Sequence, residues 1–228
     1  MVLIVSLILA SVAFLLAEAR DLPHSYRFEA SNMSFVKEYM TLPTTARSMS
    51  PTFDTDPPTE KFAPHSQSGQ DMAVLTFLKD KANGYFVDLA ANDWSRISNS
   101  YVVEYYNNWK GICIEPNPMY LKDLLSNRKC KVFTCAVGIK DGDKVKFRFS
   151  QGANGVYGGV VGEDMDNKGN ENVDKEVTLV SLTTLLDFAG APRVMDYLSL
   201  DVEGAEYQVV KGLDHTKYTF HIATVERP

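Results

Sequence analysis

Acidic side chains that could bind a small molecule stand at the ends of three predicted strands. Asp88 lies in the apolar sequence YFVDLA, and Glu115 ends the sequence ICIE. Asp201 and Glu203 lie in SLDVEGAE, after a third apolar run. In an open parallel sheet, ligands bind beyond the carboxyl ends of the strands, where the strand order reverses. A carboxylate there can accept both hydroxyls of a ribose, so these positions predict one acidic rim that binds a small molecule.

The turn that follows Asp88 has alanines where a nucleotide-binding turn usually has glycines. Ala90 and Ala91 are small enough for close approach of the backbone to a ligand. We expect them to avoid the positive φ that glycine adopts at little cost. Asn92 and Asp93 come next, and the sequence leaves open whether they contact a cofactor or only close the turn.

Three acids lie close together in SLDVEGAE. Asp201 and Glu203 alternate along the predicted strand and therefore share a face, and Gly204 turns the chain so that Glu206 begins a helix nearby. Such a group can bind a metal ion, shift the pKa values of its members or cap a helix. We favour a functional role for the group, and metal binding stays open.

These acids would be positioned by strands and helices that alternate along the chain. The predicted main strands are YFVDLA, ICIE, CKVFTCAVG, VMDYLSLDVEGAE and HIATVE, with helical patterns between them. This order predicts an α/β fold with a mostly parallel sheet and right-handed crossovers. The strictly alternating sequence KVKFRFS falls outside the pattern and predicts a hairpin or an edge insertion.

The first residues predict entry into the secretory pathway. Residues 1–17 are apolar or small and lead into the tripeptide AEA, so residues 1–19 form a signal peptide or a retained signal-anchor. Residues 20–67, rich in Pro, Ser and Thr, predict a linker that cannot bury enough apolar surface to fold. We therefore expect residues 68–228 to be a folded domain in the endoplasmic reticulum or Golgi, membrane-anchored or secreted.

Charge and cysteine content exclude two classes of function. The net charge is −6 and no basic run occurs, which argues against a nucleic-acid partner. The three cysteines form no CxxC pair, which argues against an ordinary zinc site. Cys130 and Cys135 lie on one predicted strand and cannot easily bridge each other, and Cys113 is expected to be a buried thiol.

Several motifs follow, in order and spacing, those of a known family. They are FVDLAAND, SNS, GICIEPNPMY, AVG, VSLTTLL and DYLSLDVEGAEYQVVKG. Over residues 68–228 the chain resembles the FkbM-type methyltransferase domain. The resemblance implies the class I, Rossmann-like fold of S-adenosylmethionine-dependent enzymes, and methylation of a hydroxyl on a sugar or small metabolite.

The resemblance also implies roles for the cofactor-binding residues. Asp88, Ala90 and Asn92 would line the methionine end of S-adenosylmethionine. Glu115 would hold its ribose, and Ala136 would lie near its adenine.

The acceptor side follows from the same resemblance. Asp201, Glu203 and Glu206 would face a small-molecule or glycan acceptor, and Asp201 or Glu203 would serve as base or anchor. The methyl transfer would be an in-line displacement governed mainly by positioning. The glycine-rich segment 151–162 would form a lid.

An alternative follows from the branch of the family that the chain resembles. DLAAND with GICIEPNP is most similar to the eukaryotic Star-like branch, which implies a non-catalytic factor that binds secretory cargo or a membrane partner in the endoplasmic reticulum and Golgi. Two features favour this alternative: alanine at position 90, and the predicted location in the lumen, into which the methyl donor must be imported. The family continues past TVERP into a final antiparallel strand pair, so we expect a truncated domain with HIATVE as an uncovered edge.

Overall fold

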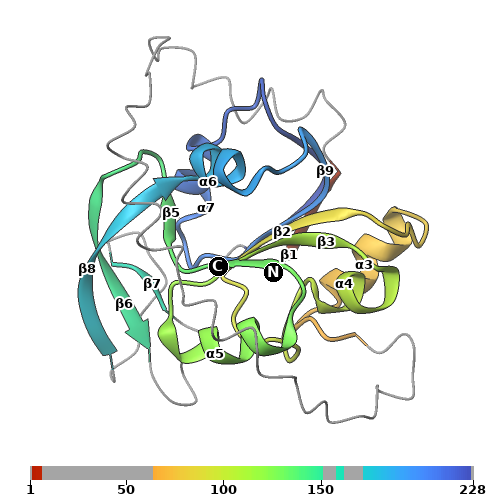
Figure 1. Ribbon diagram of the computed structural model, residues 1–228, viewed down its shortest axis with the longest axis horizontal. Coiled ribbons are helices and arrows are strands. Elements are labelled where there is room, and N and C mark those ends of the chain that lie inside the picture. The colour runs from red at the N-terminus through yellow and green to blue at the C-terminus, as the bar shows by residue number, and fades with distance from the viewer. Residues whose placement is uncertain (1, 7–63, 151–157, 162–171, 227–228) are drawn as a thin grey trace.

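The computed structural model describes residues 2–6, 64–150, 158–161 and 172–226 (Figure 1). Most of the predicted N-terminal segment 1–19, most of the linker 20–67 and most of the predicted lid 151–162 lie outside these residues. No helix within the described ranges combines the length and the hydropathy that a membrane span requires.

A six-stranded main sheet carries the strand order β1-β10-β9-β2-β3-β4. Its strands are β1 (Val2–Ser6), β2 (Tyr85–Leu89), β3 (Lys110–Ile114), β4 (Lys131–Phe133), β9 (Val194–Leu200) and β10 (Thr219–Glu226). All neighbouring pairs are parallel except β1 with β10. The chain moves outward from β2 to β4 and then returns to β9 on the other side of β2, so the strand order reverses between β2 and β9. This confirms the predicted α/β fold with a mostly parallel sheet.

The edge of β10 is covered, contrary to our expectation. β1 runs antiparallel to β10 with five paired positions, from Val2 opposite Glu226 to Ser6 opposite Ile222. A strand from the N-terminal segment therefore satisfies the backbone groups that we expected to be unpaired. Sequence pattern could not show this, because the two strands lie at opposite ends of the chain.

A second sheet lies beside the first and has the order β5-β8-β6-β7 (Figure 1). Its strands are β5 (Ala136–Gly138), β6 (Lys144–Ser150), β7 (Gly159–Val160) and β8 (Asn172–Ser181). The strand predicted in CKVFTCAVG is therefore two strands, β4 and β5, in different sheets. An apolar run buried on both faces gives no sign of where the chain leaves one sheet for another. The hairpin predicted for KVKFRFS is confirmed, since β6 pairs antiparallel with both β7 and β8.

Five helices cover the sheets within the described residues: α3 (Gln70–Phe77), α4 (Tyr101–Asn107), α5 (Pro118–Asn127), α6 (Leu182–Ala189) and α7 (Glu206–Lys211). For two of these helices, residues in the sequence explain where the helix begins or ends. Asn117 caps α5 by accepting from the backbone N–H of Met119, with proline at the first helical position. Ser181 caps α6 in the same way, and Gly190 ends that helix with φ 63°.

The two faces of the main sheet are buried in separate cores. On β2, Val87 and Leu89 pack in a core that includes the apolar face of α6. Phe86 packs on the opposite face, in a core that includes residues of α3 and α4. Because side chains alternate along a strand, Asp88 must point to the same face as Phe86. This alternation decides which side chains of β2 reach the carboxyl-end pocket described below.

A disulfide joins Cys113 of β3 to Cys130, with a Cα–Cα distance of 6.1 Å. Our expectation that Cys113 is a buried thiol is therefore wrong. Cys113 lies opposite Val132 in the register of β3 and β4, so Cys130 lies just before β4 and across from β3. Cys135 follows β4 and is a buried free thiol.

Candidate functional site

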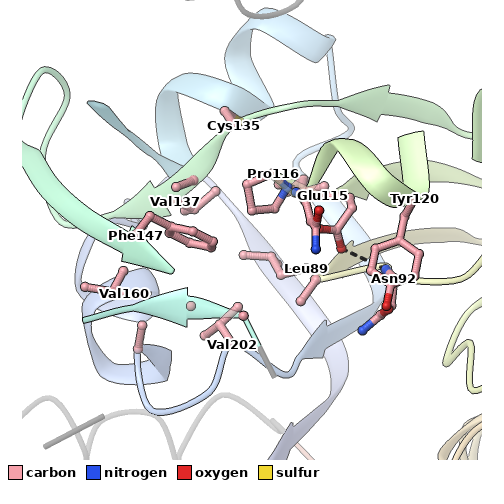
Figure 2. Close-up of a pocket in the computed structure, with 17 residues that line it drawn as sticks. Leu89, Asn92, Glu115, Pro116, Tyr120, Cys135, Val137, Phe147, Val160 and Val202 are labelled. Carbon is pink, nitrogen blue, oxygen red and sulfur yellow. Dashed lines mark hydrogen bonds between the residues drawn. The ribbon is translucent and has the colours of Figure 1, made fainter. Parts of the chain in front are cut away.

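A pocket lies beyond the carboxyl ends of β2 and β3, between the main sheet and the second sheet (Figure 2). It contains about 590 Å³ of empty space, part of it open to solvent. Glu115, Asn92 and Tyr120 line one end, and Phe147 and Val160 lie across the space from them. The pocket is at the position that the reversal of strand order predicts for a ligand.

Glu115 is the acidic group of this pocket and is held by two backbone donors. Its Oε2 accepts from the N–H of Asn92 at 2.9 Å, and its Oε1 accepts from the N–H of Asn117 at 2.7 Å. The side chain is almost fully buried, and this burial raises its pKa to about 7 although both hydrogen bonds lower it. Each oxygen of the carboxylate retains a lone pair, so the group can accept two further hydrogen bonds.

The turn between β2 and α4 adopts the conformation that we expected its alanine to avoid. Ala90 has φ 57° and Asn92 has φ 56°, both left-handed. Such a conformation costs an alanine roughly 1–2 kcal/mol. Hydrogen bonds from the N–H of Ala91 to the carbonyl of Ile114 and from the N–H of Asn92 to Glu115 hold the turn in place. Alanine therefore adopts here the left-handed conformation that glycine adopts at lower cost.

The lining residues fit a nucleoside-containing cofactor. The buried Oδ1 of Asn92 finds no hydrogen-bond partner in the described part of the chain, and Asn92 lines the pocket. A buried polar atom without a partner is costly unless a ligand or water satisfies it. Together with the free lone pairs of Glu115 it provides a polar end, while Ala136 belongs to an apolar end. Polar groups at one end and apolar lining at the other are typical of small-molecule sites.

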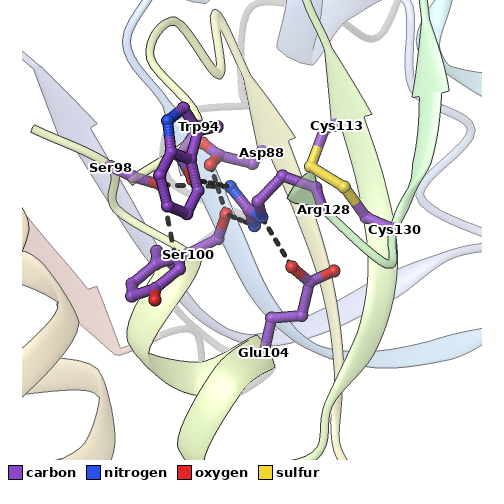
Figure 3. The surroundings of a disulfide bond; sticks show 9 residues. Asp88, Trp94, Ser98, Ser100, Glu104, Cys113, Arg128 and Cys130 are labelled. Atoms are coloured by element: carbon purple, nitrogen blue, oxygen red, sulfur yellow. Dashed lines mark hydrogen bonds and ion pairs between the residues drawn. A yellow bond between two sulfur atoms is a disulfide. The ribbon is translucent and has the colours of Figure 1, made fainter. Parts of the chain in front are cut away.

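Asp88 does not line the pocket, which corrects the role that the resemblance implied for it. Its side chain lies on the opposite face of the sheet and accepts a short hydrogen bond from the hydroxyl of Ser100 (Figure 3). Burial raises the pKa of Asp88, while the bond from Ser100 and the charge of Arg128 lower it. Asp88 thus supports the turn from behind and leaves the lining to Ala90 and Asn92.

Arg128 is the centre of this buried network. Its side chain is fully buried, and its Nε donates to Glu104 at 2.6 Å. Its Nη2 donates to the hydroxyl of Ser100 at 2.8 Å, and its Nη1 donates to the hydroxyl of Ser98 and the carbonyl of Trp94. Arg128 therefore ties the segment that follows the turn after β2 to the start of α4. Sequence reasoning missed it, since no local pattern marks an arginine that is buried only in the folded chain.

The acids of SLDVEGAE converge by a route other than the one we predicted. β9 ends at Leu200, and Glu203 has φ 55°, so Asp201 and Glu203 do not continue a strand face. They meet through this turn, and Glu226 at the end of β10 joins them, with one oxygen of each within 4.8 Å of the others. Sequence reasoning missed Glu226, because the convergence depends on the pairing of β9 with β10.

This cluster lies beside the pocket and not in its lining. Val202 and Ala205, from the same loop, line the pocket, whereas Asp201 and Glu203 do not. Burial raises the pKa of Asp201 to about 9, and a hydrogen bond with Glu226 and the charges of Glu226 and Glu203 add to this effect. Asp201 therefore holds a proton at neutral pH.

Glu206 bonds to the backbone of its own loop. Its Oε1 accepts from the N–H of Val202 at 3.1 Å and from the N–H of Gly204 at 3.2 Å. This is the geometry of a carboxylate that stabilises the turn before a helix.

Of the residues predicted at the site, the structure brings Ala90, Asn92, Glu115 and Ala136 together in one pocket. It places Asp88 behind the pocket and leaves Asp201, Glu203 and Glu206 in the adjoining loop.

Comparison with known proteins agrees with this geometry. The model of the Methyltransferase FkbM domain matches residues 88–227, which include every predicted site residue. No curated protein and no solved structure matches the chain. The matched segment is more than half of the sequence and contains β9 and the carboxyl end of β2, the two strands between which the strand order reverses. The chain therefore belongs to the FkbM methyltransferase family.

Proposed function

We propose that the protein transfers a methyl group from S-adenosylmethionine to a hydroxyl of a sugar or small metabolite. One observation carries the proposal: Glu115 is buried at the end of β3, both of its oxygens are anchored by backbone N–H groups, and it lines the pocket. This carboxylate is positioned before any ligand arrives, which reduces the loss of conformational freedom on binding.

The cofactor would supply a methyl group on a sulfonium centre, and the residues of the chain would bind and orient it. Glu115 would accept hydrogen bonds from the ribose hydroxyls. Asn92 would use its unsatisfied Oδ1 as a further acceptor, and Ala90 would allow close approach of the turn. Ala136 would contact the base. Asp88, behind the turn, would contribute through the position of the backbone and not by contact.

The acceptor hydroxyl must lose a proton during the transfer. Asp201 and Glu203, with Glu226, form the acidic group nearest in sequence to the pocket-lining Val202. Because Asp201 already holds a proton, Glu203 would accept the proton and Asp201 would hold the acceptor hydroxyl. Glu206 would fix the loop that presents them, through its bonds to the N–H groups of Val202 and Gly204.

We also propose that the protein works in the endoplasmic reticulum or Golgi lumen, or is secreted. The disulfide between Cys113 and Cys130 supports an oxidising compartment, because such bonds are rare in cytosolic proteins. The disulfide carries this part of the proposal, because Val2–Ser6 of the predicted signal segment 1–19 forms β1 and pairs with β10.

A second candidate is a non-catalytic, Star-like factor that binds secretory cargo or a membrane partner. The internal hydrogen bonds of Asp88 and Glu206 favour it, since an acid expected to line the cofactor and an acid expected to face the acceptor both stabilise the fold instead. A protein of this kind would keep the fold without turnover.

Calorimetric titration with S-adenosylmethionine and S-adenosylhomocysteine separates the two candidates. We expect binding by the unaltered chain, loss of binding in Glu115→Gln, and no loss in Glu176→Gln, a control on the exposed side of the second sheet. Thermal unfolding of each variant shows whether it folds. Absence of binding by a folded, disulfide-bonded chain would contradict the enzyme proposal and favour the trafficking factor.

A further inference from the structure

The second sheet supplies part of the pocket wall. Phe147 of β6 and Val160 of β7 are directly paired in the antiparallel register, and both line the pocket. Phe147 is only 7% exposed. Figure 2 shows its ring and Val160 across the pocket from Glu115 and Asn92. Two strands far from the motifs of the main sheet therefore form the surface that faces its acidic end.

Phe147 is held in place by the strands on both sides of it. Its strand pairs with β8 along seven positions and with β7 at two. The N–H of Val161 donates to the carbonyl of Lys146 at 2.8 Å, just before the phenylalanine. The ring also lies 4.9 Å from that of Phe149, measured between centroids. The aromatic surface is thus part of a paired sheet and does not need to be assembled by a ligand.

The side chains at this end of the pocket are apolar. Ala136, Val137, Phe147 and Val160 offer no hydrogen-bonding side-chain group, and Cys135 beside them is a thiol whose pKa burial raises to about 12. A ligand part that lies here would be recognised by shape and by contact with its face. Flat heterocyclic bases have such faces, and stacking on an aromatic side chain contributes to their binding without regard to their edges.

We propose that Phe147 is a specificity-determining binding residue, which with Val160 forms the wall against which the base of the cofactor packs. This inference rests on the proposed function, because it takes Glu115 as the ribose-binding group at the other end of the pocket. It makes the paired strands β6 and β7 part of the cofactor site. These strands select ligands that carry a flat base beyond the sugar.

Binding of adenosine, S-adenosylhomocysteine and methionine to the full chain tests this wall. We expect Phe147→Ala to weaken adenosine and S-adenosylhomocysteine binding about tenfold, with no change in the weak binding of methionine. The matched control is Phe149→Ala, which removes the same ring from the same side of the same strand but does not line the pocket. We expect the control to change the adenosine Kd by less than about twofold, because the residues that contact the ligand remain the same.

The outcomes distinguish this inference from the function on which it rests. If the unaltered chain binds adenosine and Phe147→Ala binds it equally well, the base does not pack against Phe147, and the proposed function stands. If the unaltered chain binds neither adenosine nor S-adenosylhomocysteine, both are overturned. Phe147→Leu keeps a buried apolar side chain and decides the matter if Phe147→Ala fails to fold: reduced adenosine affinity supports the stacking contact, and unchanged affinity overturns it.

Discussion

The backbone N–H of Asn92 donates to the carboxylate of Glu115 at 2.9 Å, which joins the turn after β2 to the end of β3. The turn and the acid are therefore joined directly, and Ala90 and Asn92 of the turn line the same pocket as Glu115. Since the bond is to the carboxylate itself, the protonation state of Glu115 affects both the ligand-binding group and the backbone that presents it.

Ligand affinity should therefore depend on pH through Glu115. Burial raises its pKa to about 7, and only the ionised form accepts hydrogen bonds with both oxygens. We expect the affinity for S-adenosylhomocysteine to increase roughly tenfold from pH 6 to pH 8, as the ionised fraction rises. Calorimetric titration across this range measures it, and a flat profile would contradict a role for the carboxylate in binding.

The same pKa predicts a pH dependence of stability. A glutamate whose pKa is raised on folding binds a proton more tightly in the folded state, so its contribution is complete below pH 4.5 and is lost as the pH rises to about 7. Glu115→Gln should remove up to about 3 kcal/mol of this loss. Urea unfolding at pH 5 and pH 8 measures the free energy of unfolding of the variant and of the unaltered chain. Asp201 is present in both, so its effect cancels in the difference between them.

Ala90→Gly should stabilise the fold. Ala90 has φ 57°, which costs alanine roughly 1–2 kcal/mol, and glycine would remove this cost. The greater conformational freedom of glycine in the unfolded chain offsets about half of that stabilisation. We expect a net increase of about 0.5 kcal/mol in the free energy of unfolding. The control is Ala91→Gly, at a buried neighbour without positive φ, which should destabilise the fold by about 1 kcal/mol. Equal effects of the two substitutions would show that the conformation of Ala90 is not strained.

Loss of the disulfide should lower stability substantially. Cys113 and Cys130 are separated by 17 residues, and a cross-link of that span contributes about 3 kcal/mol. The double variant Cys113→Ala/Cys130→Ala should therefore unfold at a lower urea concentration than the unaltered chain. A reductant should lower the midpoint of the unaltered chain and leave that of the double variant unchanged. A reductant that shifts both equally would exclude the cross-link as the cause.

Replacing Arg128 should be more harmful than replacing both members of its ion pair. Arg128→Met leaves Glu104 buried without its cation, which typically costs 3–5 kcal/mol. Adding Glu104→Gln should recover about half of that loss, because the uncompensated charge is gone. A double-mutant cycle by urea unfolding measures the coupling, and strictly additive effects would contradict a direct interaction.

The sequence predicted the main sheet and one end of the pocket, for reasons that particular residues show. Glu115 follows an apolar run and precedes a proline-containing turn, so its place at a strand end could be inferred. Asp88 could not be oriented, because β2 is apolar on both faces and its pattern does not show which face meets the pocket.

The residues that were missed depend on packing between distant segments. Phe147 reaches the pocket only because the second sheet lies beside the first. Cys130 was predicted at the start of the correct strand, but its position across from Cys113 depends on the register of β3 with β4, which the sequence does not show. Arg128 looks like an ordinary charged residue after a helix until its partners from α4 are brought to it.

The position of the disulfide, two residues after Arg128, has a consequence for the life of the protein in the cell (Figure 3). A chain that fails to enter an oxidising compartment keeps both thiols reduced, and it would be the less stable of two forms with the same sequence. Degradation rises steeply as stability falls. Retention in the cytosol would therefore lead to removal by quality control, which would restrict the folded protein to a compartment that forms its cross-link.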